Sequence, residues 1–126
     1  MKMGVCFKEL SMNNREFGNK GEDIACRYLE KNGYQILERN KHYSRFCEID
    51  IIAKLKNKII FIEVKTRKTN AFGTPFEAIT KTKYNNIKTG ALSYMAENKC
   101  KDYQIDVIGI TLLPELKIEH LKNISL

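Results

Sequence analysis

The sequence predicts an α/β domain in which helices pack on a central mixed β-sheet. Its expected elements follow the order α-β-β-β-α-β, with one more short strand at the end. A short polar break between the second and third strands is typical of a hairpin, which makes that part of the sheet antiparallel. A helix between the third and fourth strands is typical of a crossover connection between parallel strands. The two connections together predict a mixed sheet with helices packed on it.

The first helix is predicted over residues 15–32. Its hydrophobic side chains recur at helical spacing, and Asn13 with Glu16 three residues later matches a capping box. Gly33 is a suitable stop for this helix. Residues 1–14 show no such periodicity, so we expect a loose N-terminal tail followed by a single domain over 15–126.

Strand-like patterns occupy most of the remaining chain. Three strands are predicted over 34–40, 48–55 and 58–67, and Lys56-Asn57 separates the second from the third. A second helix is predicted over 76–98, because apolar residues again share one broad face. Two further strands are expected over 103–113 and 118–124.

Composition narrows the classes of function. The 126 residues suit one domain, and 22 Lys and Arg against 15 Asp and Glu leave a net charge of +7. Such a charge admits nucleic acid, an anionic membrane surface or an acidic protein as partner, although Lys in an Ile- and Asn-rich chain can also reflect an AT-rich genome. No apolar run is long enough for a membrane span, and no secretory signal is visible. The four cysteines lack the spacing of a zinc site, so free thiols in a reducing cytoplasm are expected.

The third strand carries charged residues in an unusual place. Glu63 and Lys65 follow four consecutive apolar residues, and period-two alternation puts both on the same face. A buried carboxylate is costly unless it is paired or bound to a cation. An ordinary Glu–Lys ion pair where the strand leaves the core explains the pattern as well as a functional site does.

Asp50 makes the second strand informative too. It lies between two isoleucines, although Asp is a poor strand former. Asp50 and Glu63 are equally far from the middle of the Lys56-Asn57 turn, so a hairpin places them opposite each other. Facing carboxylates repel, and a divalent cation such as Mg²⁺ or Mn²⁺ would remove the repulsion. The alternative is that Lys65 neutralises both acids.

Glu22 is the third acid of interest. On a helical projection it borders the apolar stripe of the first helix, whereas Asp23 and Glu30 point away. A solvated helix acid is the competing interpretation. Gly18 and Gly21, on or beside the same stripe, would permit the close approach of a strand or a phosphate backbone.

These patterns, in this order, resemble the YraN family of small bacterial cytoplasmic proteins. The resemblance covers about residues 15–124 and rests on short collinear motifs: Gly21-Glu22-x-x-Ala25-x-x-Tyr28-Leu29, Gly33-Tyr34, Arg39-Asn40, Glu48-Ile49-Asp50, Phe61-x-Glu63-Val64-Lys65-x-Arg67, Phe72-Gly73-x-Pro75, Lys81 or Lys83, and Ile105-Asp106-Val107-Ile108. That family is similar to the restriction-endonuclease-like fold with its PD-(D/E)XK signature, which includes Holliday junction resolvases. The resemblance implies this fold for the α-β-β-β-α-β core.

The resemblance also implies an active site. In such enzymes a helix acid, a strand acid and an E-x-K strand build one metal site, which corresponds to Glu22, Asp50, Glu63 and Lys65. The implied ligands of Mg²⁺ or Mn²⁺ are Asp50, Glu63 and the carbonyl of Val64, with Glu22 reaching a ligand or its water. The implied reaction is hydrolysis of a phosphodiester in DNA, with branched DNA as one substrate.

Other residues are candidates for nucleic-acid contacts. Arg67, Lys68, Lys81 and Lys83 could each touch a phosphate, and Tyr43, Phe46 and Phe72 could stack on bases. For each of them a solvated charge or a core anchor is the simpler role. Two functions stay open from sequence: a metal-dependent nuclease, which could act as a homodimer, and an inactive nucleic-acid-binding module of the same fold. A protein-interaction domain is a third, weaker alternative.

Overall fold

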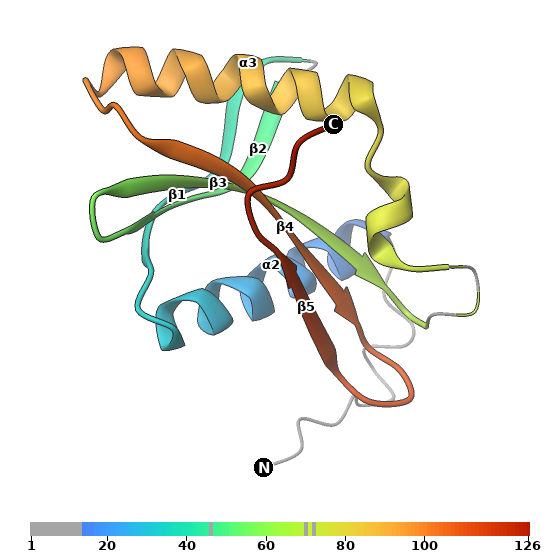
Figure 1. Cartoon of the computed structure of the whole chain (residues 1–126). Coiled ribbons are helices and arrows are strands. Elements are labelled where there is room, and N and C mark those ends of the chain that lie inside the picture. Colours follow the sequence, from blue (N-terminus) through green and yellow to red (C-terminus); the bar gives the residue numbers. More distant parts are fainter. Residues whose placement is uncertain (1–13, 46, 70, 72) are drawn as a thin grey trace.

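A five-stranded mixed sheet lies between two helices in the computed structural model (Figure 1). The structure describes residues 14–45, 47–69, 71 and 73–126, so residues 1–13 of the predicted tail lie outside it. Its elements are, in chain order, helix α2 (Asn14–Lys31), strands β1 (Gln35–Ser44), β2 (Cys47–Leu55) and β3 (Lys58–Arg67), 3-10 helix η1 (Pro75–Ala78), helix α3 (Lys81–Glu97), and strands β4 (Tyr103–Thr111) and β5 (Lys117–Leu121).

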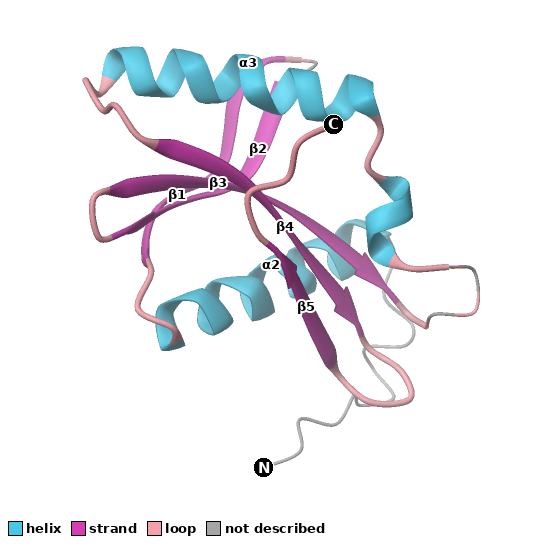
Figure 2. Ribbon diagram, viewed as in Figure 1, coloured by secondary structure: helices cyan, strands magenta, loops and turns pink. Residues whose placement is uncertain are grey.

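The strands lie in their chain order across the sheet, β1-β2-β3-β4-β5. Neighbouring strands are antiparallel except for β3 and β4, which are parallel and are connected through α3. This is the mixed sheet that the hairpin break and the helical crossover predict. Helix α2 covers one face of the sheet and α3 covers the other (Figure 2).

Strand β3 lies at the centre and is buried on both faces. Ile60, Ile62 and Val64 pack with α2, whereas Ile59 and Phe61 pack with α3. The four consecutive apolar residues of this strand follow from that double coverage, because neither face meets water.

The first helix begins and ends close to its predicted limits. Its buried side chains, among them Ile24, Ala25 and Leu29, all face the sheet. Gly33 follows the helix with φ of 89°, and the next N–H, that of Tyr34, donates to the carbonyl of Leu29 at 3.0 Å. A left-handed glycine is a common way to end a helix. The proposed cap, Asn13, lies outside the described residues.

The second helix begins later than its predicted start at residue 76. Pro75–Ala78 form a separate 3-10 turn, and Ile79 and Thr80 are extended before α3 begins at Lys81. The hydroxyl of Thr80 accepts a hydrogen bond from the Lys83 N–H at 3.0 Å, which satisfies one free amide of the first turn. The apolar period extends across this break, which is why it suggests one continuous helix.

No helix within the described ranges is both long and apolar enough to cross a membrane. Cys26 and Cys47 are buried and Cys100 is half-buried, and all three are free thiols.

Candidate active site

The hairpin of β2 and β3 has the register that the turn predicts. Its paired residues run from Leu55 opposite Lys58 to Ile51 opposite Ile62. The next position along the two strands brings Asp50 toward Glu63. There the Val64 N–H donates to Oδ2 of Asp50 at 2.9 Å, so the aspartate carboxylate replaces the regular ladder bond at the end of the pairing.

Glu63 is almost fully buried, with 3% of its side chain exposed. Its Oε1 lies 3.3 Å from the Lys83 ammonium and 3.6 Å from that of Lys65. Its Oε2 is also buried and finds no hydrogen-bond partner among the described residues. Burial raises the pKa of Glu63 above its ordinary range, against the opposing pull of the two lysines. One buried carboxylate oxygen therefore lacks the partner that its burial calls for.

Asp50 is strained electrostatically. Burial and the negative charge of Glu63 raise its pKa from 3.8 to about 7, although the Val64 N–H and the Lys83 ammonium favour the ionised form. No lysine ion pair with Asp50 is found in the described residues, so the expectation that Lys65 alone neutralises both acids is not met: Lys83 takes part as well, and both lysines contact Glu63.

Glu22 comes from helix α2, where Gly21 allows a close approach to β3. A Cβ atom at Gly21 would collide with the Thr66 hydroxyl. The Glu22 side chain is only 12% exposed, which rules out a simple solvated acid. Burial and the charge of Asp50 raise its pKa from 4.5 to about 7, while Arg39, with its Nη2 3.8 Å from Oε1, lowers it.

Asp50 therefore interacts electrostatically with both of the other acids, Glu22 and Glu63. Within the described ranges, no three His, Cys, Asp or Glu side chains lie close enough together to make a ready metal cage. The arrangement provides two neighbouring carboxylates with lysine ammonium groups beside them, and a third acid at their edge. Such a group can bind a cation, share a proton or form ion pairs.

The predicted nucleic-acid contacts have different surroundings. Arg67 is half-buried near the end of β3, Lys68 is exposed just after it, and Lys81 is exposed in the first turn of α3. Lys83 instead directs its ammonium to Glu63. Tyr43 packs against the core beneath α3, in agreement with the core-anchor interpretation. The other two aromatic candidates, Phe46 and Phe72, lie outside the described residues.

Three contributions escaped prediction from sequence. Lys83 is a direct partner of Glu63, and Arg39 fixes the helix acids by contacting Asp23 at 2.8 Å as well as Glu22. Asp106 is fully buried and accepts hydrogen bonds from three groups on β4, on β5 and beyond. The motif Ile105-Asp106-Val107-Ile108 contained the signal for Asp106, since a charged residue within an apolar strand needs a partner.

Known proteins are similar to this chain in sequence. The chain is 41% identical to a UPF0102 protein of Syntrophomonas wolfei over 113 residues, which are 87% of this chain and 97% of that protein. It is 46% identical to a UPF0102 protein of Caldicellulosiruptor saccharolyticus over 101 residues, 79% of this chain and 85% of the relative.

Among solved structures, the fold is similar to that of Hjc, a Holliday junction resolvase from Archaeoglobus fulgidus, an archaeal hyperthermophile. The TM-score is 0.56 at 19% sequence identity, and the match covers 82% of this chain and 73% of that chain. The predicted resolvase-like fold is thus confirmed. The model of the uncharacterised protein family UPF0102 matches residues 21–110, a range that includes Glu22, Asp50, Glu63 and Lys65. The chain therefore belongs to this family, UPF0102, as its resemblance to the YraN family predicts.

Proposed function

We propose that this protein is a metal-dependent nuclease that hydrolyses phosphodiesters in DNA. The observation that carries the proposal is the Asp50–Glu63 pair: two adjacent carboxylates, one of them almost fully buried, with raised pKa values and a Glu63 oxygen that has no hydrogen-bond partner in the described structure. A purely structural site gains nothing from that repulsion. Branched DNA is the substrate we favour, because the protein of similar fold is named as a Holliday junction resolvase.

The residues present fit a hard divalent cation. Carboxylate and carbonyl oxygens are the ligands that Mg²⁺ and Mn²⁺ prefer, and a cation would offset the repulsion between Asp50 and Glu63. Those two side chains and the carbonyl of Val64 would hold it, with Glu22 contacting a ligand or a water. When bound, such an ion lowers the pKa of an attacking water and offsets charge on the scissile phosphate.

The lysines have separate roles in this proposal. Lys65 is partly exposed, so it can orient the attacking water or stabilise negative charge that develops on the phosphate. Lys83 reaches Glu63 from α3 and ties that helix to the central strand. Because both ammonium groups contact Oε1 of Glu63, they hold the carboxylate in place while its buried second oxygen is left without a hydrogen-bond partner among the described residues.

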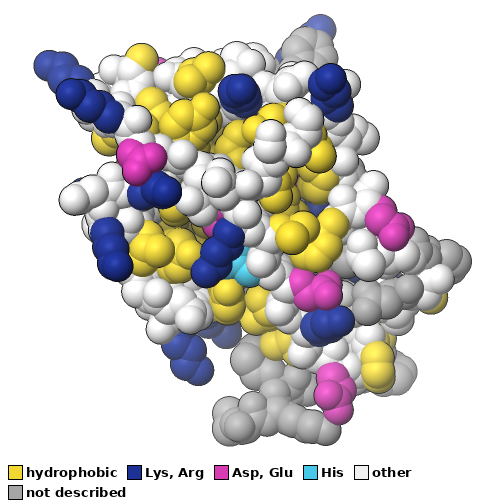
Figure 3. Space-filling view, viewed as in Figure 1, with side chains coloured by type: hydrophobic (Ala, Val, Ile, Leu, Met, Phe, Trp, Pro, Cys, Tyr) yellow, Lys and Arg dark blue, Asp and Glu magenta, His cyan; other side chains and the backbone are white. Residues whose placement is uncertain are grey.

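DNA contacts would be mainly electrostatic. A net charge of +7 favours a polyanion. Arg67 and Lys68 follow Lys65 at the end of β3, and Lys81 precedes Lys83 in the first turn of α3, so their phosphate contacts would lie close along the chain to the two lysines of the site. Lys and Arg side chains are scattered among hydrophobic atoms on the face drawn in Figure 3, with no continuous basic patch there. Binding should therefore depend on salt and show little sequence preference.

An inactive nucleic-acid-binding module is the second candidate function. One observation favours it: Lys65 and Lys83 already provide two positive charges at Glu63, as they would in a site that needs no cation. In that case DNA would bind with equal strength with and without a divalent ion.

Cleavage of end-labelled DNA decides between the two. We expect Mg²⁺- or Mn²⁺-dependent cleavage of a four-way junction by the wild-type chain. Glu63→Gln and Lys65→Ala should abolish it, whereas Glu30→Gln, which removes the same charge from an exposed position on α2, should leave it unchanged. DNA binding without cleavage, at every ion concentration and on junction, duplex and single strand alike, would reject the nuclease and favour the binding module.

A further inference from the structure

A cavity of about 430 Å³ lies at the opposite end of β3 from Lys65. It is bordered by the β2–β3 turn, the beginning of β4 and the segment after β5. Its volume is within the range of about 300–1,000 Å³ that small-molecule sites occupy. None of the residues of the proposed nuclease site lines it, so the inference below is independent of the nuclease activity.

Positive charge dominates this cavity. Lys56, Lys58 and Lys122 line it, and Asp102 is the one acid among the described residues that do so. The carboxylate of Asp102 lies 3.9 Å from the Lys58 ammonium. The two remaining ammonium groups, those of Lys56 and Lys122, thus have no carboxylate in the cavity. Their combined charge matches a dianion.

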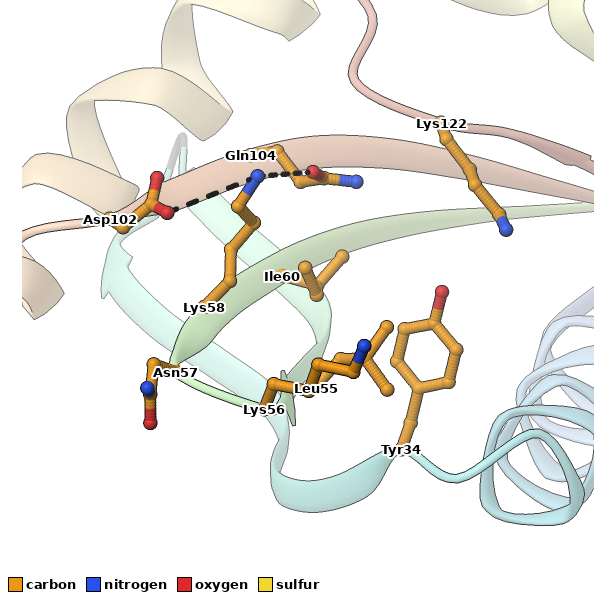
Figure 4. A pocket seen from close by; sticks show the side chains of 9 residues that line it. All are labelled: Tyr34, Leu55, Lys56, Asn57, Lys58, Ile60, Asp102, Gln104 and Lys122. Carbon is orange, nitrogen blue, oxygen red and sulfur yellow. Dashed lines mark hydrogen bonds and ion pairs between the residues drawn. The ribbon is translucent and has the colours of Figure 1, made fainter.

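The remaining lining combines two amide side chains, those of Asn57 and Gln104, with an apolar and aromatic part. Ile60 and the ring of Tyr34 are buried, and Leu55 is half-buried beside them. Figure 4 shows Lys122 reaching toward this group from one side, and Lys56 and Tyr34 lying on the other. Burial raises the pKa of the Tyr34 phenol, which keeps its hydroxyl protonated and able to donate. The cavity therefore offers cations and a donor beside an apolar surface that could hold a ring.

Hydrogen bonds to the buried carboxylate of Asp106 hold two parts of the cavity wall in place. Its Oδ1 accepts from Gln104 Nε2 at 2.8 Å, and Gln104 Oε1 in turn accepts from Lys58 at 3.3 Å. The same Oδ1 accepts from the Asn123 N–H at 2.9 Å, which anchors the backbone next to Lys122. Its Oδ2 lies 2.6 Å from His120 Nε2. A fully buried carboxylate that organises the surrounding polar groups is typical of a preformed site.

Lys56 lies in the β2–β3 turn. Lys56 has a φ of 56°, a left-handed conformation that Gly or Asn adopts at lower cost in a two-residue turn. The turn thus directs the Lys56 side chain to the lining of the cavity. Asn57, which follows it in the turn, would accept the conformation more readily.

We propose that this cavity binds a phosphate monoester, as found in a nucleoside 5′-monophosphate or at the 5′-phosphorylated end of a DNA strand. A monoester carries a charge of about −1.5 to −2 at neutral pH. Lys56 and Lys122 bind the phosphate, the Tyr34 hydroxyl donates to it, and the sugar or base covers Leu55 and Ile60.

Calorimetric titration of the full chain in EDTA, with deoxyadenosine 5′-monophosphate as probe, tests the proposal. The wild-type chain should bind the nucleotide saturably and should not bind deoxyadenosine. The double variant Lys56→Gly/Lys122→Gln should bind it about tenfold more weakly or worse. A matched control, Lys99→Gly/Lys88→Gln, removes two lysines outside the cavity, one of them also left-handed with φ of 51°, and should bind like the wild type.

Hexanucleotides with and without a 5′-phosphate identify the source of the ligand. Preference for the phosphorylated strand, lost in the double variant, assigns the cavity to DNA ends. Binding of the mononucleotide alone assigns it to free nucleotides. The double variant should have the same melting temperature as the wild type or a higher one, because Gly adopts the left-handed conformation of the turn without strain. Weaker nucleotide binding by the variant then reports the loss of the lysines and not unfolding. Absence of saturable nucleotide binding, or equal loss in the control, would overturn the proposal.

Discussion

Replacing Asp50 by Asn is expected to stabilise the metal-free protein above about pH 7 and to change its stability little near pH 4. The carboxylate of Asp50 is held beside that of Glu63, and its pKa is raised from 3.8 to about 7. An amide at this position removes the repulsion. Its side-chain oxygen can still accept the Val64 N–H, which donates to Oδ2 at 2.9 Å in the wild type.

The sign and size follow from linkage. Between about pH 4 and pH 7 the folded chain keeps a proton on Asp50 that the unfolded chain loses, so the free energy of unfolding falls as pH rises through this window. A shift from 3.8 to about 7 corresponds to about 4 kcal/mol at 1.36 kcal/mol per unit, and because Asp50 and Glu63 share the repulsion we expect about 2–4 kcal/mol. Above pH 7 the difference stays constant.

Urea unfolding of both chains in EDTA at pH 4, 5.5, 7 and 8 measures this difference. Glu22, whose pKa is also raised to about 7, owes part of that rise to the charge of Asp50, so the difference between the two chains reports Asp50 together with its repulsion of Glu22 and Glu63. If Asp50→Asn is less stable than the wild type at pH 8, or if the difference does not grow between pH 4 and pH 7, Asp50 is not strained and the reasoning about the acid pair is refuted.

Three more substitutions test other parts of the structure. Gly21→Ala should lower the free energy of unfolding by about 1–3 kcal/mol, because the new Cβ would collide with a threonine of β3. The matched control Gly18→Ala, with open space around it, should raise that free energy by up to about 1 kcal/mol. Equal stabilities of the two variants in urea would show that α2 does not approach β3 closely. Asp106→Asn should lower the free energy of unfolding by about 2–4 kcal/mol in the same assay, since an amide cannot accept all three hydrogen bonds that the carboxylate accepts. A loss below about 1 kcal/mol would count against the organising role of Asp106. Lys83→Met should tighten Mg²⁺ binding at pH 8, because it removes a positive charge 3.3 Å from Oε1 of Glu63. Weaker Mg²⁺ binding by calorimetry would show instead that the lysine is needed to hold the carboxylate.

The parts of the fold that sequence predicts are those set by local pattern. The double coverage of β3, the end of α2 at Gly33 and the register of the β2–β3 hairpin all follow from residues close together in the chain. The hairpin also predicts that Asp50 and Glu63 approach each other, because a short turn fixes which residues face one another. The beginning of α3 was missed because an apolar period does not show where the backbone becomes extended, as it does at Thr80.

The missed contributions to the site depend on contacts between distant segments. Lys83 reaches Glu63 only because the crossover through α3 places its first turn beside β3. Asp106 meets His120 across the β4–β5 pairing, 14 residues away in the chain. A motif with a charge in an apolar strand shows that a partner exists, and the three-dimensional arrangement identifies it.

Calorimetric titration of Mg²⁺ into the metal-free chain at pH 7 tests the central claim, that the Asp50–Glu63 pair is a cation site. We predict saturable binding that releases protons, because the pKa of Asp50 is about 7, that of Glu63 is also raised, and both carboxylates must ionise as the cation binds. The apparent enthalpy should therefore change with the ionisation enthalpy of the buffer, and Glu63→Gln should show no binding. No saturable uptake by the wild type, or equal uptake by Glu63→Gln, would contradict the account.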